Sequence, residues 1–306
     1  MRFNLILIIT AVGFLCCNSK SSDGQKTKDS TTTTATTATT TTASVEESNF
    51  QYNLAKPQKQ WTLDPSLLEI SGIAWMDKSH LLAIEDLTPN LYVLNLDKDG
   101  SIESKMPFMS TDKAKFDIED VTLANGIAYV LWSHGDIYQV QNWQKKPEAK
   151  TWETGLSKDN NTEGLCFDPV SGNLLVACKN EAGVADEKKS TRAIYSFDIN
   201  KGQLNKEPFM VINRKDFKKI GGDKIDFNPS AIAIHPKTKD IYVLSTKGTK
   251  CLAEFNRQGK LVSFQYIDKE LMPQPEGMTF APDGTLYIST EGKDALPGKV
   301  LQFNSK

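Results

Sequence analysis

Five short motifs share one layout, in which a glutamate or serine stands directly before an apolar stretch. They are Glu69-Ile-Ser71-Gly72, Asp117-Ile-Glu119-Asp120, Asn161-Thr-Glu163-Gly164, Asn228-Pro-Ser230-Ala231 and Gln274-Pro-Glu276-Gly277. Each begins with a polar residue and ends with a small or acidic one. Carboxylates, amides and hydroxyls offer oxygen ligands, which suit hard Ca²⁺ rather than zinc. If the five copies meet in the fold, they predict a calcium site.

The motifs recur at intervals of 48, 44, 67 and 46 residues, counted between the Glu or Ser positions 71, 119, 163, 230 and 276. After each motif the sequence predicts a strand, a turn, a second apolar strand, a third strand and a more polar fourth one. A period of ~40–50 residues with four strands is typical of a β-propeller. We therefore expect an all-β fold, a five-bladed β-propeller of four-stranded antiparallel blades. The long step is explained by loops at Lys179–Arg192 and Asn213–Asn228.

The last repeat ends without a fourth strand, whereas residues 58–64 before the first repeat form a strand without a partner. We expect this N-terminal strand to complete the last blade and to close the propeller, which removes an open sheet edge.

In a propeller the first strand of each blade lines the central channel, and its start lies at the same end as the finish of the second strand. This end is called the mouth below. We expect metal ligands among Glu119, Glu163 and Glu276, with Glu69, Asp117, Asn161 and Asn180. Further mouth candidates are Glu85, Asp86, Ser71, Ser230, His134 and Glu291. Carboxylates crowded in one ring require protons or a cation; the alternative is that they only solvate the mouth and bind strand-start amides.

Other signals are weaker. Asn95, Asp97, Asp99 and Gly100 imitate an EF-hand loop, but its twelfth position is Met106, so we interpret the segment as an Asp-Gly hairpin turn. We expect His80 and His235 in solvated turns at the opposite face. The sequence contains no G-x-S-x-G, P-loop or C-x-x-C motif, and no catalytic residue is predicted.

Three cysteines fall within predicted strands. With Phe167 opposite Leu174, Cys166 would face Leu175 and Cys178 would face Glu163, an offset that disfavours a disulfide. Cys251 lies alone in another strand. We expect three buried free thiols.

The N-terminus predicts export. A basic start is followed by an apolar run, Leu5 to Leu15, which is shorter than the ~20 residues that span a bilayer but suits a signal-peptide core. The end of this run resembles a bacterial lipoprotein signal with Cys17 as the acylated residue, although Cys16 replaces the usual small residue. The alternative is an ordinary signal peptide with two incidental cysteines. Asn18 after Cys17 favours an outer-membrane anchor.

Three segments are therefore expected: a lipoprotein signal peptide at 1–17, a disordered Ser/Thr-rich tether at 18–48, and the propeller domain at 49–306. The tether contains almost no apolar residues, so it cannot bury enough surface to offset its ordering entropy.

The motifs E-x-S-G, D-I-E-D, N-x-E-G, N-P-S-A and P-E-G at successive strand starts resemble the SdiA-regulated (YjiK-like) propellers, over residues 61–304. The resemblance implies a five-bladed propeller, an extracytoplasmic location and a calcium site, with no established reaction. It also implies a distant likeness to NHL-repeat and gluconolactonase-like propellers.

Two functions are consistent with these observations. The first is a membrane-anchored, calcium-binding module that takes an unknown small-molecule or protein ligand at the mouth. The second is a metal-dependent hydrolase of lactonase, phosphoesterase or phytase-like type acting at the same place, which rests on fold analogy. The net charge of −2 gives no basic surface for nucleic acid, and we expect a monomer.

Overall fold

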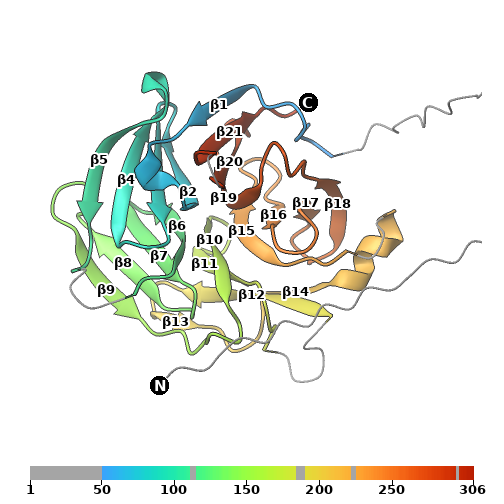
Figure 1. The fold of residues 1–306 in the computed structure, drawn as a ribbon. Coiled ribbons are helices and arrows are strands. Elements are labelled where there is room, and N and C mark those ends of the chain that lie inside the picture. Colours follow the sequence, from blue (N-terminus) through green and yellow to red (C-terminus); the bar gives the residue numbers. More distant parts are fainter. Residues whose placement is uncertain (1–49, 111–114, 184–189, 222–224, 294–295) are drawn as a thin grey trace, which may run out of the picture. The chain divides into compact units, whose positions relative to one another are not determined.

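The short apolar runs of the sequence form antiparallel strands, which group into five separate sheets around a common centre (Figure 1). The computed structural model describes residues 50–110, 115–183, 190–221, 225–293 and 296–306, all within one unit of the chain, residues 47–306. Cys17 and the expected tether lie outside the described residues, so the predicted lipoprotein signal stays a prediction.

Each sheet is a blade, and its strands follow one another outward from the centre. The first blade contains β2 (Ile70–Asp77), β3 (His80–Glu85), β4 (Asn90–Asn95) and β5 (Ser101–Pro107). The second contains β6 (Ile118–Ala124), β7 (Ile127–Trp132), β8 (Ile137–Gln141) and β9 (Glu148–Trp152). The fourth contains β15 (Pro229–Ile234), β16 (Ile241–Ser245), β17 (Cys251–Phe255) and β18 (Leu261–Tyr266). The predicted all-β, five-bladed propeller is confirmed.

The third blade differs from the others at its outer edge. It contains β10 (Thr162–Asp168), β11 (Asn173–Cys178), β12 (Thr191–Asp198), β13 (Gln203–Leu204) and β14 (Met210–Asn213), and both short strands pair with β12. The segment after β14, which we expected to be a loop, contains the 3₁₀ helix η3 (Arg214–Ile220). Its Phe217 is fully buried against Phe227, at a ring distance of 4.9 Å, so this segment belongs to the core.

The fifth blade combines strands from both ends of the described chain. It contains β19 (Gln274–Phe280), β20 (Leu286–Glu291) and β21 (Lys299–Phe303), and β1 (Lys59–Thr62) pairs with β21 at its outer edge. Trp61 of β1 is buried, and its indole Nε1 donates a 2.9 Å hydrogen bond to the carbonyl of Leu96 in η2 (Leu96–Lys98), which follows β4 of the first blade. That this strand holds the ring closed stays a prediction.

Residues before β1 also pack into the propeller, which the sequence analysis did not anticipate. Phe50, Tyr52 and Leu54 are buried among residues of the fourth and fifth blades. The Tyr52 hydroxyl donates to the carbonyl of Gly284 at 2.7 Å. These three side chains, called the N-terminal wedge below, anchor the chain ahead of β1.

Every innermost strand has a β-bulge at its motif. The register shifts between Ile70 and Ile73, Ile118 and Asp120, Thr162 and Gly164, Pro229 and Ala231, and Pro275 and Gly277. The recurring Glu or Ser therefore lies in the bulge without a strand partner, and in β2 Gly72 lacks one as well. A bulge changes the direction in which a side chain points. The bulge also corrects the expected pairing of Cys178, which lies opposite Thr162 rather than Glu163. Cys166 faces Leu175 as expected, and Cys166, Cys178 and Cys251 are buried free thiols.

The small residue after each bulge is explained by the neighbouring blade. A Cβ on Gly277 would lie 2.3 Å from the carbonyl oxygen of Ser71, and one on Gly72 would lie 2.5 Å from the Cα of Asp120. Asp120 is the exception, and its buried carboxylate accepts the backbone N–H of Leu165 in the next blade at 2.7 Å. Burial raises the pKa of Asp120 although this hydrogen bond opposes the rise.

The two turn histidines differ in exposure. His80 is half-buried beside Asp77, with Nδ1 at 2.9 Å from a carboxylate oxygen. His235 was expected in solvent, but it is only 1% exposed because it packs against Tyr52 and Phe280. Its ring Nδ1 accepts the backbone N–H of Thr238 at 3.1 Å.

In the part of the chain that the structure describes, no helix has the length and apolar character needed to cross a membrane.

Candidate functional site at the channel mouth

The bulges bring three motif glutamates close enough to influence one another. Burial and the charges of Glu163 and Asp117 raise the pKa of Glu119 to about 10. Burial and Glu163 raise the pKa of Glu276 to about 8. Carboxylates that act on each other's pKa in this way lie near one another in a poorly solvated place. The two remaining bulge positions, Ser71 and Ser230, are buried and uncharged.

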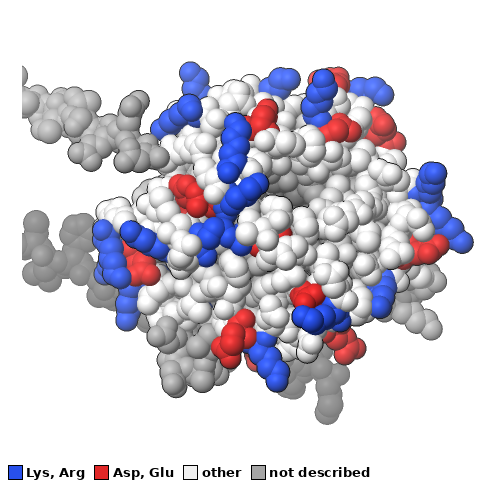
Figure 2. All heavy atoms as spheres, turned by 180° about the vertical axis from the view of Figure 1, so that it is seen from behind, with Lys and Arg blue, Asp and Glu red and all other residues white. Residues whose placement is uncertain are grey.

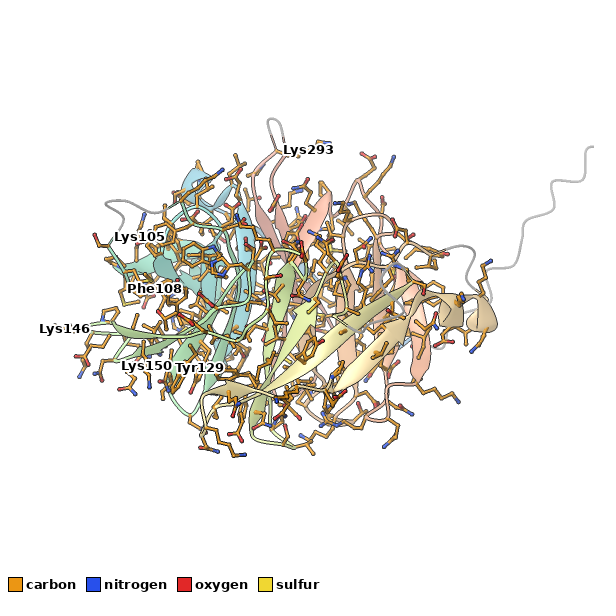
Figure 3. The ribbon with its side chains drawn as sticks, turned by 90° about the horizontal axis from the view of Figure 1, so that it is seen from below. Lys105, Phe108, Tyr129, Lys146, Lys150 and Lys293 are labelled. Atoms are coloured by element: carbon orange, nitrogen blue, oxygen red, sulfur yellow. The ribbon has the colours of Figure 1, made fainter. Side chains whose placement is uncertain are left out.

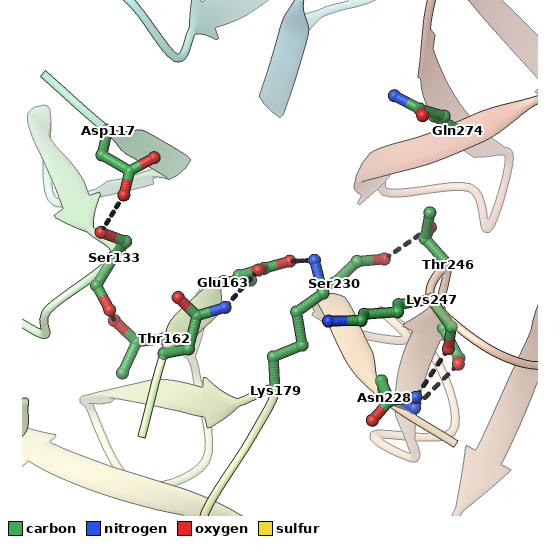
Figure 4. Close-up of polar contacts among 12 residues, drawn as sticks. Asp117, Ser133, Thr162, Glu163, Lys179, Asn228, Ser230, Thr246, Lys247 and Gln274 are labelled. Carbon is green, nitrogen blue, oxygen red and sulfur yellow. Dashed lines mark hydrogen bonds and ion pairs between the residues drawn. The ribbon is translucent and has the colours of Figure 1, made fainter. Parts of the chain in front are cut away.

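Glu163 is held from two sides by residues at the neighbouring strand ends (Figure 4). Asn161 Nδ2 donates to its Oε1 at 2.6 Å, and the ammonium of Lys179 contacts its Oε2. The Glu163 side chain is 5% exposed and that of Lys179 15%. Burial raises the pKa of Glu163, opposed by Lys179. Burial lowers the pKa of Lys179, but Glu163 and Glu276 outweigh it and raise that pKa.

Lys179 is a site residue whose role the sequence analysis missed. It directly follows β11, as Asp86 follows β3 and Ser133 follows β7, and Glu291 is the last residue of β20. That equivalence places it at the mouth, but nothing in the sequence shows that its side chain turns toward Glu163. The ammonium of Lys179 thus places a positive charge beside the predicted calcium ligands Glu163, Glu276 and Glu119.

A second group of acids lies on the side of the first and fifth blades. Burial, Glu69 and Glu291 raise the pKa of Asp86 to about 7, and its Oδ1 is buried without a hydrogen-bond partner among the described residues. Burial also raises the pKa of Glu291 to about 7, although it accepts a hydrogen bond from the Gln274 amide. Asp86, Glu69 and Glu291 therefore extend the acidic mouth beyond the three bulge glutamates.

The other predicted candidates lie at the edge of this arrangement. Asp117 is exposed and accepts a 2.6 Å hydrogen bond from the Ser133 hydroxyl (Figure 4). Asn180 is half-buried, and its backbone N–H donates to the carbonyl of Asn160 at 3.0 Å.

Glu85 and His134 are engaged in local structure. The carboxylate of Glu85 accepts the backbone N–H of Leu87 at 2.8 Å and the hydroxyl of Thr88, so it caps the turn after β3. His134 packs on Trp132, with ring centres 4.7 Å apart, and its Nδ1 lies 3.7 Å from Asp136. The structure therefore gives both residues a local role in the turns of their own blades.

Lysines accompany the acids, so the mouth carries both signs of charge. Lys250 donates to the carbonyl of Thr246 at 2.9 Å, and burial lowers its pKa while Glu276 opposes this. Lys179 and Lys293 lower the pKa of Lys250 further, which places these lysines near one another. Figure 3 shows Lys293 on a loop above the inner strands.

The sequence model of the SdiA-regulated family matches residues 42–293. The chain belongs to the SdiA-regulated family. This confirms the resemblance that the five motifs suggested. A search of the curated proteins finds no match.

The fold of this SdiA-regulated protein is similar to several solved structures. The glutaminyl cyclase of Myxococcus xanthus aligns with a TM-score of 0.55 and 12% identity, over 82% of this chain and 96% of that one. The PQQ-bound aldose sugar dehydrogenase of Streptomyces coelicolor aligns with a TM-score of 0.50 and 11% identity, over 82% of this chain and 98% of that one. A Bacteroides thetaiotaomicron protein of unknown function aligns with a TM-score of 0.50 and 14% identity, over 76% of this chain and 58% of that one. At such identities the likeness shows the fold alone, since one fold hosts many reactions.

The donor set of this SdiA-regulated protein fits calcium in its chemistry. Glu119, Glu163 and Glu276 offer only oxygen ligands, and Oε2 of Glu163 has Lys179 as its partner but no hydrogen bond among the described residues. Within the same residues, no three His, Cys, Asp or Glu side chains form a ready-made metal site. Calcium would therefore require these carboxylates to turn toward one point, with Lys179 displaced from Glu163.

Proposed function

We propose that this SdiA-regulated propeller is a binding module, in which Glu119, Glu163 and Glu276 hold Ca²⁺ at the channel mouth beside the site for a small-molecule or protein ligand. The observation that supports the proposal is that three buried or half-buried carboxyl groups lie beside one ammonium, that of Lys179, which contacts Glu163. Asp117, Asn161, Glu69 and Asn180 are available as further oxygen ligands.

Either protons or a metal cation can neutralise the carboxylates of the mouth. The raised pKa values of Glu119 and Glu276 mean that both carboxyls keep their protons near neutral pH when Lys179 alone offsets Glu163. A divalent cation supplies two positive charges at one point, and it can replace these protons. Calcium binding should therefore release protons, as metal binding to acidic ligands does in general.

The experiment is thermal unfolding of the wild-type protein with added Ca²⁺ and with chelator at neutral pH. A ligand that binds only the folded state stabilises it by about 2.7 kcal/mol at a hundredfold excess over Kd. We expect chelation to lower Tm, and Glu163→Gln to reduce this response.

The matched control is Asp97→Asn. Asp97 lies in the turn that imitates an EF-hand, where it accepts a 2.5 Å hydrogen bond from the Ser79 hydroxyl. Removing the charge of Asp97 should leave the change in Tm between Ca²⁺ and chelator as it is in the wild-type protein. If chelator does not change Tm, or if Asp97→Asn abolishes the response, the mouth is not the calcium site.

A hydrolase is the second candidate. The observation that favours it is that Asp86 and Glu291 have pKa values of about 7, which suit proton transfer near neutral pH. A screen of lactone, phosphoester and phytate hydrolysis with and without Ca²⁺ separates the candidates. Turnover that is lost in Asp86→Asn or Glu291→Gln would favour the enzyme, and binding of a ligand without turnover would favour the module.

We also propose that Cys17 anchors the propeller to the outer membrane of the cell envelope. The support is the short apolar run that ends in Cys16-Cys17-Asn18, followed by the Ser/Thr-rich segment 18–48. Mass spectrometry of the mature protein should find an acylated Cys17 at its N-terminus. A Cys17→Ser protein that stays in the membrane fraction would contradict the anchor.

A further inference from the structure

A second feature lies at the end of the channel opposite the mouth. Here the later halves of all five innermost strands line a cavity of about 250 Å³ that is open to solvent. Figure 2 shows this face, which is hollowed near its centre with Lys and Arg side chains close by. The cavity shares no residue with the acidic mouth, so it is a separate candidate site.

The lining of the cavity exposes polar and apolar atoms in about equal measure. Trp75, Phe167 and Phe280 belong to three different blades, and most of the other lining residues are aliphatic. Thr122 and Thr279 are the lining residues of the strands that carry a hydroxyl. Thr279 accepts the backbone N–H of Trp75 at 3.1 Å and Thr122 that of Phe167 at 3.2 Å, so both are fixed by contacts between blades.

One charged side chain, Lys239, lines the cavity. Its backbone has φ 65°, in the left-handed region, within the turn after β15, and its ammonium donates to the carbonyl of Pro236. No ion pair among the described residues involves Lys239. Asp168, which directly precedes the lining residue Pro169, is already held by both terminal nitrogens of Arg257, at 3.0 and 2.7 Å. Asp240 follows Lys239 in the same turn and forms no ion pair with it. Lys239 therefore contributes a positive charge without an ion-pair partner, in the described part of the chain, to the lining of the cavity.

We propose that this cavity binds a small organic carboxylate with an apolar body, such as an arylacetic acid. The volume sets the size, because a cavity of about 150 Å³ is already large enough for benzene. A cavity of about 250 Å³ thus holds one ring with a short side chain. Lys239 favours an anionic ligand, because its ammonium has three hydrogen-bond donors and the Pro236 carbonyl accepts one of them. The aromatic lining binds the ring, and the carboxylate lies toward Lys239.

The test is calorimetric titration of the wild-type protein with phenylacetate and with its neutral amide, phenylacetamide. We expect phenylacetate to bind with a Kd of about 1 mM or below. The amide should bind at least tenfold more weakly. Absence of phenylacetate binding in this range would overturn the site, and equal binding of both probes would overturn the role of charge.

Matched variants locate the binding. Lys239→Gln should weaken phenylacetate at least tenfold, whereas Lys237→Gln, two residues earlier in the same turn but not lining the cavity, should not. Tryptophan fluorescence should respond to phenylacetate, and Trp75→Phe should remove that response. If Lys237→Gln weakens binding as much as Lys239→Gln, the binding reflects surface charge and the proposal fails.

Discussion

At the residue scale, Lys179 decides how the acidic mouth behaves without metal. Its ammonium contacts Glu163, and it lies within the influence of Glu276 and Glu119. A tethered cation of this kind competes with a free one for the same carboxylate. If the mouth binds Ca²⁺ as proposed, the calcium affinity depends on how much more strongly the carboxylates bind Ca²⁺ than the Lys179 ammonium.

We therefore expect Lys179→Met to lower the stability of the metal-free protein, by up to about 3 kcal/mol, because it leaves Glu163 buried without its cation. The same variant should bind Ca²⁺ more tightly, since no ammonium competes. Calorimetry and thermal unfolding measure both effects. Lys201→Met is the control, because the ion pair of Lys201 with Asp198 involves none of the mouth acids. Weaker calcium binding by Lys179→Met would show that Lys179 supports the site rather than competing for it.

His235 gives a prediction about pH. Burial lowers its pKa, so the folded protein keeps the ring neutral while the unfolded chain takes up a proton below about pH 6.5. Stability should therefore fall as the pH drops from 6.5 toward the lower pKa of the folded state, by up to about 1.4 kcal/mol per pH unit. His235→Asn keeps an acceptor for Thr238 and removes the titration. Denaturant unfolding between pH 7 and 5 should show a smaller slope for the variant; identical slopes would exclude His235 as the source.

At the element scale, the bulge and the small residue after it work as one unit. The bulge turns a side chain into the mouth, and the small residue lets the next blade approach. We expect Gly277→Ala to cost about 1–3 kcal/mol, because its Cβ would meet the Ser71 carbonyl at 2.3 Å. Gly164→Ala should cost less, since its closest contacts are at 3.1 Å. Denaturant midpoints test whether Gly277→Ala loses more stability than Gly164→Ala. A smaller loss for Gly277→Ala would mean that the neighbouring blade moves away from the added Cβ at little cost.

The sequence was sufficient for the elements but not for their exact contacts. Repeat spacing predicted five blades because the four-strand unit must recur to bury its apolar faces. The spacing could not reveal the bulge, which inserts one residue without changing the apolar pattern, and so Cys178 was paired with Glu163 instead of Thr162. Nor could it show that His235 is covered, because Phe280 and Tyr52 reach it from distant parts of the chain.

The candidate site was predictable to a similar degree. The motif glutamates could be brought to one mouth, because the first strands of all blades share a direction. The partner of Glu163 could not be identified, since the direction of the Lys179 side chain depends on the charges around it. The cavity at the other end left no sequence signal, because its lining has the same apolar residues as any buried strand.

At the scale of the whole molecule, stability depends on the N-terminal residues. Deleting residues 1–49 should leave Tm unchanged, since the described contacts begin at Phe50. Deleting 1–56 removes the N-terminal wedge, and deleting 1–66 also removes Trp61 and uncovers the edge of β21. We expect successive losses that reach several kcal/mol in the shortest of the three chains, from lost apolar burial. Equal melting temperatures for all three would refute closure by this strand.

The pairing of β1 with β21 also constrains how the protein is made. Trp61 lies opposite Val300, so two of the most distant parts of the propeller must find each other. Contacts this remote in sequence form slowly, because the chain must first lose the entropy of a very large loop. During synthesis the first four blades can form in order from their own neighbouring strands, while β1 waits with its backbone unpaired. Among the described strands, the one that is made first therefore has to wait longest for its partner, because β1 cannot pair before β21 has emerged.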